Sequence, residues 1–353
     1  MAAVIDCADP RTLAGFDEII DVRTPAEFAL DHAPGAVNLP VLSDSERAMV
    51  GTIYVQESRL KARRTGAALV ARNIAGHLEA ALRDKPGAYA PLIYCWRGGQ
   101  RSLAMATVLE QVGWRPTRLA GGYMTYRRRV SAALYEGAPP ERLILLDGST
   151  GSAKTEILGR LAAHGVQTLD LEGLAQHRGS LFGARPGQAQ PSQKRFESRL
   201  LAALETLEPS RPIVVEAESS KIGQINLPPA LWRAMALAPR IELAVSRPAR
   251  IAYLVGVYGD LAAETGPMTA AIEALPGRHG ARRRASWRAL LAAGDLAALA
   301  GDLVDAHYDP AYERSRRRDG RVALGRVEMA DLSARAQEDA ARRIADLVRA
   351  HAG

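Results

Sequence analysis

The stretch from Ile93 to Ser102 constrains the fold more than any other part of the chain. It reads Ile-Tyr-Cys-Trp-Arg-Gly-Gly-Gln-Arg-Ser and places a cysteine between a short apolar run and a helix-like run. Backbone N–H groups of a tight loop that leads into a helix converge on one point, which attracts an anion. Gly98 and Gly99 permit this curvature because they have no Cβ atom. The pattern therefore predicts a strand, an anion-binding loop and a helix in direct succession.

Cys95 is the candidate catalytic residue of this loop. The field that attracts an anion also favours the thiolate, so we expect a nucleophile rather than an inert core residue. Arg97 and Arg101 flank the two glycines and are the other candidate catalytic residues. Gly98 and Gly99 are expected to contribute phosphate-binding N–H groups.

A second phosphate-binding loop is expected directly after the apolar run 142–147. Its sequence, Asp-Gly-Ser-Thr-Gly-Ser-Ala-Lys-Thr, has the Walker A pattern. We expect Lys154 to reach a terminal phosphate and Thr155 to offer its hydroxyl to Mg²⁺. Ala153 replaces the glycine of the pattern, which a methyl group tolerates if φ is negative there. The expected phosphate-binding residues are Gly148, Ser149, Thr150, Gly151, Ser152, Ala153, Lys154 and Thr155.

Four polar residues near this loop are candidates for contacts to Mg²⁺ or to the substrate. The apolar run 213–215 leads to Glu216 and Glu218, which either hold Mg²⁺ through water or pair with an arginine. His177 and Arg178 are candidates for phosphate contacts, although a single histidine is more often structural. Beyond Mg²⁺, no tightly bound cofactor and no resident metal are expected.

Arginine dominates the charge of the chain. Lys and Arg together number 46 against 39 Asp and Glu, which gives a net charge of +7. Two interpretations remain open, namely solvated helix faces or contacts to a nucleic-acid backbone. The candidate arginines for contacts to a nucleic-acid backbone are Arg127, Arg128, Arg129, Arg282, Arg283, Arg284, Arg316, Arg317 and Arg318.

Composition narrows the class of protein further. The only cysteines are Cys7 and Cys95, so neither a disulfide framework nor a cysteine metal site is expected. The sequence has no 18-residue apolar stretch and no signal-peptide pattern. We therefore expect a cytoplasmic protein that does not associate with membranes.

Strand-like and helix-like runs alternate along the chain, which predicts an α/β protein of two domains with parallel sheets. Residues 1–136 are expected to form the domain that carries Cys95, with a long helix at 66–82. The prolines at 139 and 140 mark a linker. Residues 137–353 are expected to form the second domain, with strands at 142–147, 212–216 and 241–245. Its Arg-rich part from residue 248 onward is expected to be largely helical.

The first domain resembles the rhodanese family. The matching runs are 21–28 (Asp-Val-Arg-Thr-Pro-Ala-Glu-Phe), 32–40 (His-Ala-Pro-Gly-Ala-Val-Asn-Leu-Pro) and the closing Gly121-Gly122-Tyr123. Five residues separate Cys95 from Arg101, one more than in simple sulfurtransferases of that family. The longer loop resembles that of the cell-cycle phosphatases with this fold and suits a tetrahedral oxyanion. Asp21 and Arg23 are expected to form a buried ion pair.

The whole chain resembles the tRNA 2-selenouridine synthases. The resemblance rests on the two loops together with runs 172–180, 216–223 and 307–312. It implies a transferase that replaces the sulfur of wobble 2-thiouridine by selenium from selenophosphate, through an S-geranylated intermediate made from geranyl diphosphate. It also implies tRNAs with Lys, Glu or Gln acceptors as substrates, and an enzyme that supplies selenophosphate as a partner.

Two other functions remain open from the residues alone. One is a phosphatase fused to a kinase-like domain, with Cys95 as nucleophile and Arg101 as clamp. The other is a non-catalytic RNA-binding ATPase. The sequence also leaves open whether the Walker A loop binds geranyl diphosphate, ATP or GTP.

Overall fold

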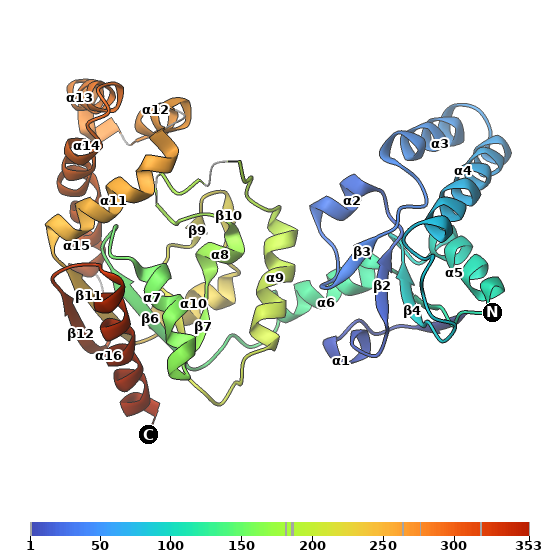
Figure 1. Cartoon of the computed structure of the whole chain (residues 1–353), viewed down its shortest axis with the longest axis horizontal. Helices are drawn as coiled ribbons and strands as arrows, with labels where there is room; N and C mark the ends of the chain where they lie inside the picture. The colour runs from blue at the N-terminus through green and yellow to red at the C-terminus, as the bar shows by residue number, and fades with distance from the viewer. Residues whose placement is uncertain are drawn as a thin grey trace. The chain divides into compact units, whose positions relative to one another are not determined.

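The computed structural model describes residues 2–180, 182–184, 187–262, 265–275, 277–317 and 320–352. The chain divides into two compact units (Figure 1). The first comprises Met1–Gly137 and Ser192–Ala202, and the second comprises Ala138–Pro191 and Ala203–Gly353. Residues 192–202 lie in the second expected domain by sequence, but they pack with the first unit. No helix in the described ranges is long and apolar enough to cross a membrane.

The first unit contains a five-stranded parallel sheet. The strand order is β1 (Ala3–Ile5), β5 (Thr117–Leu119), β4 (Pro91–Tyr94), β2 (Glu18–Asp21) and β3 (Ala36–Asn38). Its helices are α1 (Pro10–Leu13), α2 (Pro25–Leu30), α3 (Asp44–Gln56), α4 (Arg59–Glu79), α5 (Gln100–Val112) and α6 (Tyr123–Tyr135). The core joins Ile20 and Ile93 of the sheet to Met105 and Leu109 of α5. The expected parallel α/β fold is confirmed.

Two helices form a hairpin between β3 and β4. Ser43 caps the N-terminus of α3. Its hydroxyl accepts a hydrogen bond from the Glu46 N–H, and the Glu46 carboxylate accepts one from the Ser43 N–H. The expected helix at 66–82 starts earlier, at Arg59, because the Ser58 side chain caps the new helix through the N–H of Lys61.

The segment 192–202 is tied to the first unit by buried polar groups. It belongs to α9 (Gln193–Glu205). The Asp31 carboxylate accepts hydrogen bonds from the Ser198 hydroxyl at 2.9 Å and the Tyr123 hydroxyl at 2.8 Å. The buried Glu197 pairs with Arg127 and accepts a hydrogen bond from Tyr135. These long-range contacts explain why the unit includes a segment that the chain order places elsewhere.

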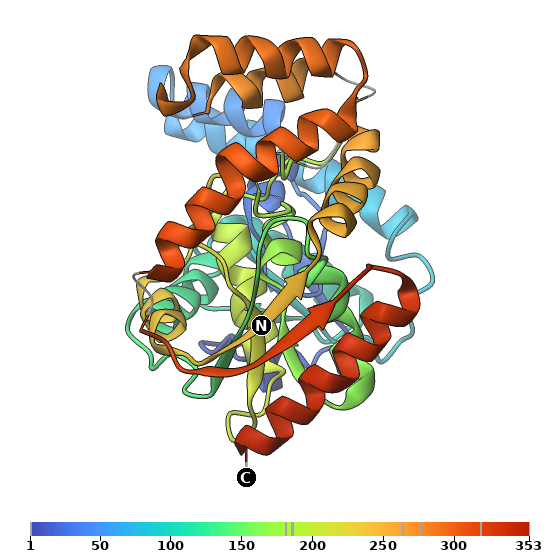
Figure 2. The same ribbon diagram turned by 90° about the vertical axis from the view of Figure 1, so that its left-hand side faces the viewer.

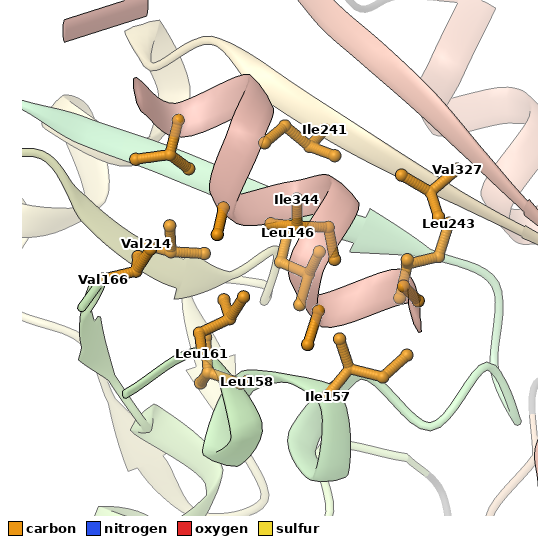
Figure 3. Packing of buried hydrophobic residues seen from close by; sticks show 14 of the residues in the cluster. Leu146, Ile157, Leu158, Leu161, Val166, Val214, Ile241, Leu243, Val327 and Ile344 are labelled. Carbon is orange, nitrogen blue, oxygen red and sulfur yellow. The ribbon is translucent and has the colours of Figure 1, made fainter. Parts of the chain in front are cut away.

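The second unit contains another five-stranded parallel sheet. The order is β12 (Ala323–Met329), β11 (Arg240–Val245), β6 (Leu143–Gly148), β8 (Ile213–Glu216) and β7 (Gln167–Leu169). Helices α7 (Lys154–Leu161) and α16 (Ala334–Ala352) pack on it, and Figure 3 shows Leu158 and Ile344 meeting Leu146 and Ile241 in that core. The remaining elements here are η1 (Ala162–His164), α8 (Leu171–Ala175) and the hairpin strands β9 (Lys221–Ile222) and β10 (Ile225–Asn226).

The rest of the second unit is largely helical. It consists of α10 (Pro229–Leu237), α11 (Arg247–Ala262), α12 (Thr265–Glu273), η2 (Gly277–His279), α13 (Gly280–Ala292), α14 (Leu296–Leu303), the π-helical η3 (Val304–Tyr308) and α15 (Asp309–Arg317). Trp287 and Leu299 lie at the centre of a second core in this region.

The expectation of a largely helical region after residue 248 is confirmed, although the region also contains the strand β12. This strand lies beside β11 and leads into α16 (Figure 2). Only Val327 and Met329 are buried along its length, so its sequence, Ala-Leu-Gly-Arg-Val-Glu-Met, shows only a short alternation of apolar and charged residues. The hydrogen bonds to β11 and the packing of α16 make it a strand, and neither is visible in the local sequence.

Candidate active sites

The Cys95 loop begins where β4 ends. Cys95 is only 3% exposed, so its sulfur lies beneath the loop. The N–H of Gly99, just before α5, donates to the sulfur at 3.2 Å. The Ser102 hydroxyl lies 3.3 Å from the sulfur. The Ser102 hydroxyl also donates to the Gly99 carbonyl at 3.1 Å, so the Gly99 N–H is the defined hydrogen-bond donor to the sulfur.

The closing turn at residues 121–123 braces this loop. The N–H of Tyr123 donates to the Cys95 carbonyl at 2.8 Å, and the N–H of Met124 donates to the Trp96 carbonyl at 3.2 Å. Gly122 has φ +58°, and a Cβ there would lie 2.1 Å from the Cys95 carbonyl oxygen. A side chain at position 122 would therefore displace the cysteine, which is why this turn needs glycine.

The two arginines of the loop lie in different surroundings. Arg101 forms an ion pair with Glu27 at 2.6 Å, and Glu27 also caps α2. Burial raises the pKa of Glu27, but the hydrogen bonds from Arg101 and the Thr24 N–H and the charge of Arg101 outweigh it, so the pKa is lowered. Arg97 is exposed. Arg101 is thus held at the edge of the loop by a carboxylate.

The expected buried ion pair of Asp21 and Arg23 is confirmed. Both side chains are buried, and the Arg23 guanidinium donates to the Asp21 carboxylate at 2.6 Å. Arg23 also donates to the Asp31 carbonyl at 2.6 Å and lies 4.0 Å from the centre of the Tyr123 ring. The pair fixes the carboxyl end of β2 beside the Cys95 loop.

In the second unit, residues 149–153 connect β6 to α7 as a Walker A loop requires. Ala153 has φ +54° and ψ +36°, in the left-handed region. The methyl group of Ala153 would be unstrained only at a negative φ, so it is strained here. The loop keeps the backbone conformation that glycine favours while carrying an alanine, which costs about 1–2 kcal/mol.

We expect substitutions at position 153 to be strongly asymmetric. Ala153→Gly should change the free energy of unfolding by no more than about 1 kcal/mol, because relief of strain offsets the lost methyl burial and the entropy of glycine. Ala153→Val should lower it by about 2–4 kcal/mol, because a β-branched residue is both strained and overpacked there. Urea unfolding measures both. Equal effects of Val at position 153 and at Ala162, where φ is −59°, would contradict the left-handed assignment.

Lys154 lies at the end of the loop, where it is half-buried and still charged. Its Nζ donates to the Gly148 carbonyl at 2.7 Å and lies 3.4 Å from the Tyr312 hydroxyl. Burial lowers the pKa of Lys154, but Tyr312, Glu218 and Glu172 outweigh it and raise the pKa above its ordinary value. A fixed cation is thus available for phosphate oxygens.

Carboxylates gather beside this cation. The Thr155 hydroxyl donates to Glu172 at 3.0 Å. A Cβ on Gly179 would lie 2.5 Å from Glu172 and 2.6 Å from Glu218, so both carboxylates converge on this glycine. Burial and the charge of Glu218 raise the pKa of Glu172 to about 8. Glu172 is a site residue that the sequence patterns did not single out.

Glu216, at the end of β8, is turned away from the cavity that the loop lines. It is fully buried and accepts a hydrogen bond from the N–H of Leu171 at 2.9 Å. Burial, with the charges of Asp170, Glu172 and Glu218, raises its pKa well above the ordinary value. Glu216 thus supports α8, whereas Glu218 lines the cavity.

Arg250 is a second site residue without a sequence signal. From α11 it donates to the Thr150 carbonyl at 2.9 Å and pairs with Asp309 of α15 at 2.6 Å. The guanidinium therefore ties the phosphate loop to two helices far along the chain. No local motif marks it, because its role arises only from the packing of α11 on the loop.

The Walker A loop opens into a cavity of about 670 Å³. Its polar lining includes Lys154, Thr155, Glu218 and Arg178. His177 is buried and is not among the lining residues, so the two neighbours differ in their access to a ligand. The cavity also has apolar and aromatic walls, formed by Leu145, Trp232, Met235, Tyr253, Leu254, Val257, Tyr308 and Tyr312.

His307 lines the same cavity and lies near Arg278 and Arg314. It lies 3.1 Å from His279 between ring nitrogens. Burial, His279, Arg278 and Arg314 lower the pKa of His307 to about 4. Burial and the charges of Arg278, Arg283 and Arg284 likewise lower the pKa of His279. The side chain is therefore neutral at pH 7.

The His307 pKa makes stability depend on pH. Its folded pKa lies below the ordinary value of 6.5, so the unfolded chain binds more protons between pH 6.5 and 4. We therefore expect the free energy of unfolding to decrease as the pH is lowered from 6.5 to 4, by at most about 1.4 kcal/mol per pH unit from this group. His307→Gln should flatten that fall in thermal or urea unfolding, while the exposed His351→Gln should not. A wild-type slope in His307→Gln would refute the assignment.

The arginine clusters differ in how far they are engaged. Arg127 pairs with the buried Glu197, while Arg128 is exposed. On α13, Arg282 is exposed, Arg283 lies 3.7 Å from Asp302, and Arg284 is half-buried. Arg129 is also half-buried. Arg318 lies outside the described residues, as do the side chains of Arg316 and Arg317.

The fold and the two loops define a rhodanese-like domain joined to a P-loop-like domain. Family models agree, since the rhodanese-like domain matches residues 7–129 and the AAA domain of tRNA 2-selenouridine synthase matches residues 141–273. The tRNA 2-selenouridine synthase of Bordetella bronchiseptica is 34% identical over 348 residues, which cover 88% of this chain and 92% of that protein. The chain belongs to the tRNA 2-selenouridine synthase family.

Other relatives align over a shorter length. The synthase of Chromohalobacter salexigens is 40% identical in an alignment that covers 64% of this chain. The synthase of Hahella chejuensis is 38% identical in an alignment that covers 66% of this chain. These alignments span 60% and 61% of the two relatives.

Proposed function

We propose that this protein is a tRNA-modifying transferase that converts wobble 2-thiouridine to 2-selenouridine. Geranyl diphosphate and selenophosphate would be its small substrates. The membership of the family supports the overall reaction, and the two loops supply the chemistry that it needs. The tRNA substrates would be those with Lys, Glu or Gln acceptors, in the cytoplasm.

The observation that carries the proposal is the composition of the cavity beside the Walker A loop. The lining includes Lys154 and the N–H-rich loop, which suit a diphosphate. The walls include Trp232, Met235 and Val257, which suit a branched hydrocarbon chain. A nucleotide would fit the polar lining equally well, but the apolar walls favour a prenyl diphosphate.

In the proposed first step, the thiouridine sulfur attacks C1 of geranyl diphosphate. The S–C1 bond forms, the C1–O bond breaks, and the diphosphate leaves with the electron pair while N3 of the base loses its proton. Lys154 would stabilise the charge that develops on the diphosphate. Arg250 would keep the loop in place through its bond to the Thr150 carbonyl.

In the proposed second step, selenium replaces the alkylated sulfur. The Se–C2 bond forms, the C2–S bond breaks, and geranylthiol leaves after taking up a proton. Water takes the phosphoryl group of selenophosphate, which ends as phosphate. The Cys95 loop, with the Gly99 N–H and Arg101 at its edge, would bind this tetrahedral donor.

The residues beside Lys154 fit Mg²⁺. Thr155, Glu172 and Glu218 present the hard oxygen donors that this ion prefers. They would hold it against the diphosphate, whose charge it would partly neutralise. No ready-made cluster of three metal-binding side chains exists in the described ranges. The diphosphate itself would therefore have to complete the coordination.

The RNA would lie over the basic rim beside the cavity. Arg278, Arg283, Arg284 and Arg314 surround the His279–His307 pair, and this side of the cavity therefore attracts phosphates. A selenophosphate-supplying enzyme is the proposed protein partner of the Cys95 loop.

The test is nucleoside mass spectrometry of thiolated tRNA incubated with the protein, geranyl diphosphate and selenophosphate. We expect geranylated thiouridine with the first substrate alone and selenouridine with both. Hydrolysis of an aryl phosphate without any change in the tRNA nucleosides would instead indicate the phosphatase alternative.

A further inference from the structure

The α3–α4 hairpin of the first unit extends beyond what the fold requires. It connects β3 to β4, and a parallel crossover needs only a dozen or more residues. No residue of α3 is buried, and α4 buries only Ala62 and Ile74. The outer half of the hairpin therefore adds little to the core, and Figure 1 shows α3 and the start of α4 projecting from the sheet.

One face of α4 serves the core along only half its length. Val70, Ile74 and Leu78 follow one another at helical spacing, and they pack on the core that includes Cys95. The same stripe continues toward the N-terminus through Arg63 and Leu60. Leu60 is 77% exposed, so within the described part of the chain little covers this end of the stripe.

Positive charge surrounds the uncovered end. Arg59, Arg63 and Arg64 are exposed, and α4 contains no acidic residue before Glu79. In the described ranges, these three arginines have no recorded carboxylate partner, whereas Lys61 pairs with Glu57. Cations in the first turn of a helix oppose its dipole and cost about 0.3–1 kcal/mol each. Of the three arginines, only Arg59 lies in the first turn, and its position weakens the helix unless an anion binds there.

Apolar groups lie beside these cations at the tip. Tyr54 is half exposed, and the Arg59 guanidinium lies 5.6 Å from the centre of its ring. Val55 is 83% exposed. A cationic surface with an exposed aromatic ring is the combination by which proteins bind a phosphate backbone and stack on unpaired bases.

We propose that the tip of the hairpin, formed by Tyr54, Arg59, Leu60, Arg63 and Arg64, binds the sugar–phosphate backbone of RNA. This surface belongs to the first unit, whereas the arginines of α13 and α15 belong to the second. It rests on the proposed function only in taking tRNA as the RNA. Charge complementarity favours RNA over a protein partner, because each nucleotide supplies one phosphate for these arginines.

The experiment measures binding of tRNA to the full-length Arg59→Ala/Arg63→Ala variant at several salt concentrations. Each lost phosphate contact should reduce the slope of log affinity against log salt by about 0.7–0.9. We expect a reduction of about 1.4–1.8 for the pair. The control is Arg11→Ala/Arg83→Ala, which removes two exposed arginines from the same unit and should keep the wild-type slope.

Arg59→Lys/Arg63→Lys should restore most of the slope, because the charge returns at the same positions. Unchanged melting temperatures would show that all three pairs fold. A wild-type slope in Arg59→Ala/Arg63→Ala would overturn the proposal, including the case in which this variant instead loses self-association or binding to a protein.

A second probe separates this inference from the synthase assignment. Poly(U) carries phosphates but no thiolated base. If the wild type binds poly(U) and the hairpin variant loses part of the salt slope, the RNA surface stands even where nucleoside analysis shows no modification. If nucleoside analysis shows selenouridine while neither RNA responds to the hairpin substitutions, the synthase assignment stands and the surface does not.

Discussion

Replacing Cys95 by alanine is expected to abolish selenation of geranylated tRNA, with a loss on the order of 100-fold or more. The proposal places the selenium donor at this loop, where the sulfur accepts a hydrogen bond from the Gly99 N–H and lies 3.3 Å from the Ser102 hydroxyl. Geranylation should continue at the wild-type rate, because the diphosphate loop is in the other unit. Nucleoside mass spectrometry of each step separately measures both effects.

The fold should survive this substitution. The loop is held by backbone bonds from Tyr123 and Met124, and these do not involve the sulfur. Loss of the buried sulfur should cost about 1 kcal/mol of unfolding free energy. Cys7→Ala is the matched control, because Cys7 is exposed and lies outside the loop. Wild-type selenation by Cys95→Ala would show that the cysteine is not catalytic.

Replacing Lys154 by alanine should weaken binding of geranyl diphosphate by about one to two decades. A charge-assisted contact to phosphate is worth about 1.5–3 kcal/mol, and Lys154 is the cation held inside the loop by the Gly148 carbonyl. Titration calorimetry measures the affinity. Geranylation should fall with it, while selenation of pre-geranylated tRNA should change little.

Lys221→Ala is the control for this prediction, because Lys221 is an exposed lysine of the same unit. An equal loss of both chemical steps in Lys154→Ala would argue against a diphosphate site. The loop would then act on a step that geranylation and selenation share, such as binding of the tRNA.

The sequence alone determined the features that depend on neighbouring residues. Gly98 and Gly99 after a strand predict a tight loop at Cys95, and the run 147–155 predicts a phosphate loop between a strand and a helix. Both loops occur where they were expected because a few consecutive residues specify their backbone conformation. The alternation of strands and helices likewise sufficed for the parallel α/β fold.

Only the tertiary structure decided the surroundings of these loops. Arg101 was expected to clamp an anion, but in the structure Glu27, which precedes it by 74 residues, holds its guanidinium. Arg250 reaches Thr150 across 100 residues, and Glu172 meets Glu218 at Gly179. Such partners depend on how helices pack, and sequence patterns carry no record of distances between segments that are far apart.

The strand β12 and the segment 192–202 show the same limit. Only Val327 and Met329 of β12 are buried, and pairing with β11 makes it a strand. Ser198 is an ordinary helix residue by sequence, yet its bond to the buried Asp31 ties α9 to the first unit. Local chemistry therefore specified both loops of this protein, while long-range packing chose the groups that surround them.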